Sequence, residues 1–82
     1  MITDAKAKAN IAANVQRLME MHGFTQAQLA EATGETQGAI SKVLNGHHMP
    51  GAGFLARLAE ALDYSTDKLL AKPPTEARRQ SA

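Results

Sequence analysis

The stretch that decides the fold reads TQAQLAEATGETQGAISKVLNG, from Thr25 to Gly46. Thr25 is followed three residues later by Gln28, the spacing of a capping box, so a helix is predicted to begin there. Thr36 is the predicted cap of a second helix. Glycine adopts the left-handed conformation that ends helices, so Gly34 and Gly46 are the predicted ends. Two short helices joined by a tight turn are therefore expected.

The flanking sequence predicts three further helices. Residues 3–22 are rich in alanine and contain no glycine or proline, which favours a helix ending at Gly23. A fourth helix is predicted by apolar side chains at helical spacing, namely Leu55, Leu58, Ala59 and Leu62. Ser65 caps a last short helix that ends before Pro73. The predicted fold is all-α, a compact bundle of about five short helices. Core positions are expected to include Leu29, Ile40, Leu44, Leu58 and Leu62.

The expected organisation is a single domain. Residues 10–71 contain the predicted helices, residues 1–9 form an N-terminal arm or a helical extension, and residues 72–82 form a polar tail or linker. The chain has 82 residues, of which 44% are hydrophobic, which suffices for one small core. No apolar run has the length of a membrane span and no signal peptide is apparent. With no cysteine in the chain, we expect a cytoplasmic protein without disulfides.

The second helix of the opening stretch has an unusual exposed face. Its apolar positions are Ile40, Val43 and Leu44, and the opposite face carries only uncharged or cationic residues: Gln37, Gly38, Ser41, Lys42 and Asn45. Amides, a hydroxyl and one lysine suit the base edges and phosphates of a DNA major groove. An ordinary solvated face is the alternative, although such faces normally mix glutamate with lysine. The net charge of +1 does not by itself indicate nucleic acid.

From about Ile11 to Leu70 the sequence resembles the helix-turn-helix domains of phage repressors, the Cro-like or lambda-repressor-like family. The resemblance depends on several positions together: Gln26, Leu29, Ala30, Gly34, Gln37, Ile40, Leu44, Asn45 and Gly46. It implies a helix-turn-helix fold, in place of an unrelated αα-hairpin, and binding to duplex DNA. The sequence departs from the family at Gly38, where many relatives have a base-reading side chain. It also departs at Gly51 and Gly53, where the fourth helix usually begins with polar, helix-favouring residues, and at Asp63, where glycine often ends that helix.

The resemblance also implies roles for individual residues. Gln26 would contact a backbone phosphate and brace Gln37, which would read adenine through its bidentate amide. Asn45 would contact a second phosphate. Gly38 would either reduce the number of bases read or let the DNA backbone come close. The expected DNA-binding residues are Gln26, Thr36, Gln37, Gly38, Ser41, Lys42, Asn45 and His47.

Adjacent histidines, His47 and His48, raise the question of a metal site. They point in different directions and no third ligand lies at a convincing spacing, so no metal is expected. A position near phosphate, or a plain loop position, fits these histidines better. No nucleophile-elbow or phosphate-loop pattern occurs in the sequence, so we expect neither catalysis nor a cofactor.

The resulting functional expectation is a sequence-specific transcriptional repressor of bacterial or phage type. Relatives bind near-palindromic operators as dimers, so a homodimer on double-stranded DNA is expected. One alternative is an antitoxin that represses its own operon and also binds a toxin. The other is a protein-interaction module that keeps the fold but no longer binds DNA.

Overall fold

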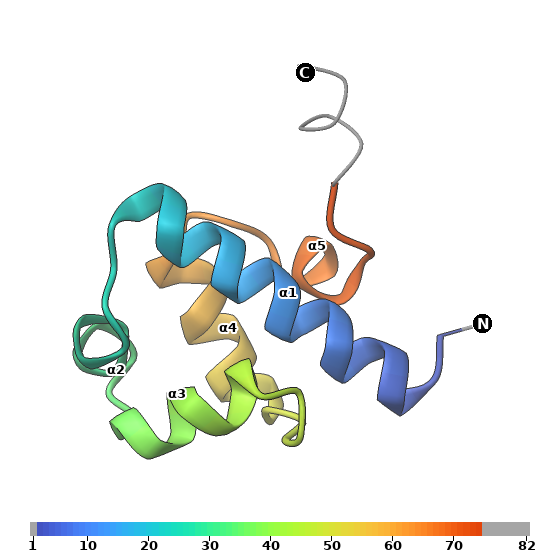
Figure 1. Cartoon of the computed structure of the whole chain (residues 1–82), viewed down its shortest axis with the longest axis horizontal. Coiled ribbons are helices and arrows are strands. Elements are labelled where there is room, and N and C mark those ends of the chain that lie inside the picture. Colours follow the sequence, from blue (N-terminus) through green and yellow to red (C-terminus); the bar gives the residue numbers. More distant parts are fainter. Residues whose placement is uncertain (1, 75–82) are drawn as a thin grey trace.

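The computed structural model describes residues 2–74, and its elements follow one another as helices (Figure 1). The part of the predicted tail that covers residues 75–82 lies outside the described residues. Within the described range there is no strand, and the expected all-α bundle is confirmed. No helix in this range is both long and apolar enough to cross a bilayer. The five helices are α1 (Asp4–His22), α2 (Gln26–Thr33), α3 (Gln37–Leu44), α4 (Ala52–Ala61) and α5 (Thr66–Leu70).

The predicted caps set the helix boundaries. The Thr25 hydroxyl accepts from the backbone of Gln28, and the Gln28 side chain accepts from the backbone of Thr25, which completes the capping box of α2. Thr36 and Ser65 cap α3 and α5 through one bond each, accepting from the amide three residues on. These bonds satisfy amide groups that have no partner inside their own helix.

Residues 4–9 continue α1 without interruption toward the N-terminus. Thr3 caps this end by accepting from the amide of Lys6, and Ala7 is buried. The segment expected as an arm or a helical extension is thus helical from Asp4 onward.

The core is built from buried side chains of all five helices. Of the five core positions predicted, Leu29, Ile40, Leu58 and Leu62 have no exposed surface. The prediction for Leu44 is wrong, because this side chain is only half-buried. Ile40 and Val43 occupy the centre of the apolar stripe of α3, and Leu44 lies about 70° to one side of that centre at 100° per residue. It therefore packs at the edge of the core.

Two asparagines of α1 join this helix to the end of α5. The Asn14 amide, which is fully buried, donates to the carbonyls of Lys68, Leu69 and Ala71 at 2.8–3.1 Å. One turn earlier, Asn10 donates to the carbonyl of Leu70 at 2.9 Å. The last carbonyls of a helix have no partner within it, so these amides complete the C-terminal end of α5 and hold it against α1.

The connection from α4 to α5 turns sharply at Asp63. This residue has a φ of 54°, the left-handed conformation that glycine usually supplies at a helix end. The preceding carbonyl, that of Leu62, lies 2.9 Å from Nε2 of His22. A carbonyl can only accept, so the ring carries a proton on Nε2. The C-terminal end of α1 is thereby attached to the end of α4.

Candidate nucleic-acid interface

Helices α2 and α3 meet through a turn of three residues. Gly34 ends α2 with a φ of 73°, and the amide of Glu35 returns to the carbonyl of Ala30 at 3.0 Å. Ala30 is itself buried, and α2 and α3 pack against each other. The absence of a larger side chain there lets α2 and α3 approach closely, as the arrangement of a helix-turn-helix requires.

A side chain of α4 holds this turn in place. Arg57 donates from Nε to the carbonyl of Thr33 at 2.8 Å, and its Nη2 forms an ion pair with Glu35. The turn is thus fixed to the helix behind it, which sets the direction in which α3 leaves. Sequence reasoning missed Arg57, since the pair spans 22 residues and neither partner belongs to a local motif.

The polar face of α3 is available to a partner. Gln37, Gly38, Lys42 and Asn45 are exposed, and Ser41 is half-buried. Within residues 2–74, no side-chain hydrogen bond or ion pair engages the side chains of Gln37, Ser41, Lys42 or Asn45. Their donors and acceptors therefore face solvent, where a ligand can use them.

Thr36 and Gly38 begin this face in different ways. The Thr36 hydroxyl accepts from the amide of Ala39 at 3.0 Å, which leaves its proton free to be donated to a ligand. A Cβ placed on Gly38 would lie 3.9 Å from that hydroxyl oxygen, an ordinary contact, and the φ of Gly38 is not positive. The fold therefore does not require glycine at position 38.

The two glutamines expected to cooperate do not touch in the free protein. Gln26, the first residue of α2, is half-buried, whereas Gln37 is exposed. No hydrogen bond joins their side chains in the described part of the chain. The bracing of Gln37 by Gln26 stays a prediction, which concerns the DNA-bound state.

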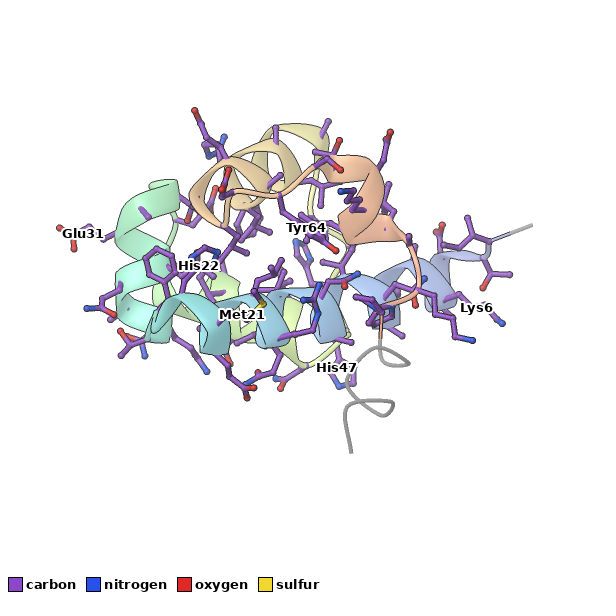
Figure 2. The ribbon with its side chains drawn as sticks, turned by 90° about the horizontal axis from the view of Figure 1, so that it is seen from above. Lys6, Met21, His22, Glu31, His47 and Tyr64 are labelled. Atoms are coloured by element: carbon purple, nitrogen blue, oxygen red, sulfur yellow. The ribbon has the colours of Figure 1, made fainter. Side chains whose placement is uncertain are left out.

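The loop after α3 places the histidines on the surface. His47 and His48 are both exposed, whereas Pro50, two residues before α4, is buried. In Figure 2 the His47 side chain lies well away from Glu31 of α2. No three metal-ligating side chains converge anywhere between residues 2 and 74. His47 thus lies at the C-terminal end of α3, next to the exposed Asn45.

Acidic side chains near the helix-turn-helix point elsewhere or are paired. Glu35 is engaged by Arg57. Glu31 projects from the outer side of α2, at the opposite end of the view from Lys6 (Figure 2). It lines an open depression of about 450 Å³ at the α1–α2 corner, to which no residue of α3 contributes. The exposed face of α3 is thus free of carboxylates, as its sequence predicted.

Comparisons with known proteins agree with this geometry. The family model described as helix-turn-helix matches residues 15–69. The search of curated proteins found no significant match. Among solved structures, a hypothetical transcription factor from Neisseria superposes with a TM-score of 0.80 at 22% identity, covering 98% of this chain and 89% of that one. A helix-turn-helix family transcriptional regulator from Vibrio cholerae superposes with a TM-score of 0.77 at 24% identity, covering 90% and 42%.

Proposed function

The chain belongs to the helix-turn-helix family, and from this premise we propose that it is a sequence-specific repressor that binds duplex DNA through the major groove. Membership makes it a DNA-binding transcriptional regulator rather than an enzyme. Repression, a near-palindromic operator and a homodimer on DNA are the finer parts of the proposal.

One observation supports the proposal more than any other. Helix α3 presents amides, a hydroxyl and a lysine without a single carboxylate, and none of the polar side chains on that face is used within the described structure. Unpaired amide groups held on a rigid helix can form the bidentate contacts that distinguish one base pair from another. Lysine adds attraction to phosphate without sequence preference.

The proposed contacts divide into two kinds. Gln37, together with Ser41, reads base edges, because both lie on the exposed face of α3. Gln26 and Asn45, at the start of α2 and the end of α3, contact backbone phosphates and fix the position of α3 in the groove. Lys42 contributes charge, and Thr36 contributes its free hydroxyl proton.

A dimer follows from the resemblance to phage repressors. Two copies related by a twofold axis would place their α3 helices in successive major grooves, about 34 Å apart on one side of the duplex. The proposed operator is then near-palindromic, with half-sites one helical turn apart. The proposed partner of the protein is double-stranded DNA, and the expected location of the protein is the cytoplasm.

The decisive experiment is a binding selection from a random duplex pool at a stated salt concentration. A near-palindromic consensus is expected. Binding to the selected duplex should weaken with salt, with a log–log slope near −7 for a dimer making roughly eight phosphate contacts at about −0.9 each. A single, unrepeated half-site would contradict the dimer. Absence of binding to any duplex at low salt would contradict the DNA function and favour the protein-interaction module.

Two single lysine substitutions distinguish the loss of a phosphate contact from the loss of one positive charge elsewhere on the protein. Lys42→Ala should flatten the salt slope by about one per bound copy, because it removes one phosphate contact. Lys68→Ala is the control, since Lys68 is also exposed but lies on α5, where it approaches the ring of Tyr64. Equal slopes for the two variants would remove Lys42 from the interface.

A further inference from the structure

Two lysines on the first turns of α1 lie on opposite sides of that helix. Lys8 precedes Ala12 by one turn, and a Cβ built on Gly46 would lie 4.0 Å from the Cβ of Ala12. This is where α1 meets Gly46, the second residue after α3. Residues four apart share a helix face, so Lys8 projects on the side of α1 that faces the end of α3.

Lys6 lies on the other side by the same reasoning. It precedes Asn10 by one turn, and the Asn10 amide donates to the carbonyl of Leu70 at the end of α5. Lys6 therefore projects on the side of α1 that faces α5. In Figure 2 its side chain extends from the N-terminal end of α1, away from His47. The two lysines carry the same charge and lie on the same helix, but Lys8 faces the end of α3 whereas Lys6 faces α5.

The slope of α1 brings its first turns to the level of the proposed interface. In Figure 1 this helix descends toward its N-terminus, so that its beginning reaches the height of α3 and of the loop after it. A duplex lying under the exposed face of α3 would pass close to these turns. The side of α1 that carries Lys8 would then face the phosphates beyond Asn45 and His47.

Lys8 is available for such a contact. Its side chain is half-buried, and within residues 2–74 it forms no ion pair. Asp4 lies one turn before it, at a spacing that permits an ion pair, yet the two groups remain apart. Nothing in the described structure therefore neutralises the ammonium group.

We propose that Lys8 binds a backbone phosphate adjacent to the one proposed for Asn45, which extends the DNA interface from the helix-turn-helix onto α1. The proposal rests on the proposed DNA-binding function and adds a residue outside the motif to it. Lys8 lies about 6 Å along the helix axis from Ala12, at 1.5 Å per residue. Its side chain leans toward the N-terminus of α1, so it would meet a phosphate next to the one at Asn45 rather than the same one. A compact ammonium charge suits a phosphate that needs neutralisation without base recognition.

The test compares Lys8→Ala with Lys6→Ala in the full chain. Fluorescence anisotropy on the selected operator and on a mixed-sequence duplex is recorded over a series of salt concentrations. Lys8→Ala should make the log–log slope less negative by about 0.9 per bound copy, and should weaken both duplexes alike. Lys6→Ala should leave the slope close to that of the parent. Lys8→Arg should restore it, because arginine also neutralises phosphate.

The outcomes separate this proposal from the proposed function. If the parent binds duplex DNA and Lys8→Ala has the same slope as Lys6→Ala, the contact is absent while the DNA function stands. If the parent binds no duplex, both the Lys8 contact and the proposed DNA-binding function are contradicted. Alanine favours helices, and circular-dichroism melts should show that both variants keep the parent's helix content. Asp4→Asn should strengthen binding, because it removes a carboxylate one turn from Lys8; weaker binding by that variant would count against the contact.

Discussion

The amide side chains of α1 and those of the helix-turn-helix have the same chemistry but opposite uses. Asn10 and Asn14 donate to carbonyls at the end of α5, and Asn14 has no exposed surface. Gln37 and Asn45 on α3 have no side-chain hydrogen bond within the described residues and are exposed. The first pair is part of what holds the fold together, whereas the second is available to another molecule.

This difference indicates where function can change without loss of the fold. A buried amide that loses its partner leaves carbonyls unsatisfied, which costs free energy of unfolding. An exposed amide with no partner can be replaced at almost no cost in stability. The substitutions below should therefore separate into those that alter unfolding and those that alter DNA binding.

The largest effect on stability is expected in the core that both regions share. Leu58→Ala should lower the free energy of unfolding by roughly 2–5 kcal/mol, because Leu58 is fully buried and its truncation leaves a cavity. Thermal and urea melts measure this loss, which would unfold much of a domain this small. Melts that overlay those of the parent would remove Leu58 from the core.

Asn14→Ala tests the structural half of the comparison. It should lower the free energy of unfolding by roughly 2–4 kcal/mol, since it removes three donor contacts to the end of α5 and leaves a small cavity. Urea melts provide the measurement. Gln16→Ala is the control, because Gln16 is exposed on the same helix. If both variants melt alike, the amide of Asn14 does not hold α5 against α1.

Gln37→Ala tests the functional half. It should weaken operator binding by about 1–3 kcal/mol per half-site and relax selection at one base pair, because a bidentate contact is lost. Its free energy of unfolding should stay within about 0.5 kcal/mol of the parent. A binding selection with the variant gives the base preference. An unchanged preference at every position would contradict base reading by Gln37.

The smallest change concerns Gly38, where fold and function should respond in opposite directions. Gly38→Ala should raise the free energy of unfolding by about 0.5–1 kcal/mol, because alanine favours a helix and the space is open. If the DNA backbone approaches this position closely, the added methyl group should weaken binding, which is the result we expect. Unchanged affinity, measured by anisotropy, would mean that Gly38 only lacks a base-reading side chain.

The helix boundaries were predictable because their signals are local. Thr25, Thr36 and Ser65 each cap a helix by bonding an amide three residues away, and Gly34 takes its left-handed conformation where the sequence placed it. Such contacts depend on neighbouring residues alone. The polar face of α3 was predictable for a related reason, since the helical period assigns each side chain to one side of the helix.

The contacts of Asn14 and Arg57 were not predictable in this way. Asn14 meets carbonyls 54–57 residues away, and Arg57 meets Thr33 and Glu35 from another helix. The local sequence around an asparagine in a helix does not show whether its amide faces solvent or a distant carbonyl. The half-buried position of Leu44 was missed because an apolar residue at the edge of a stripe resembles one at its centre.

The sequence alone determined which segments are helices, where they end, and that α3 has a face of amides and one lysine without acid. These properties arise from backbone propensities and side-chain spacing within a few residues. Only the tertiary structure decided which side-chain amides form hydrogen bonds within the protein. It also decided how Arg57 fixes the turn before α3, and that Lys8 and Lys6 face different helices. Those outcomes depend on how helices pack, which joins groups that are distant in the chain and unrelated in the sequence.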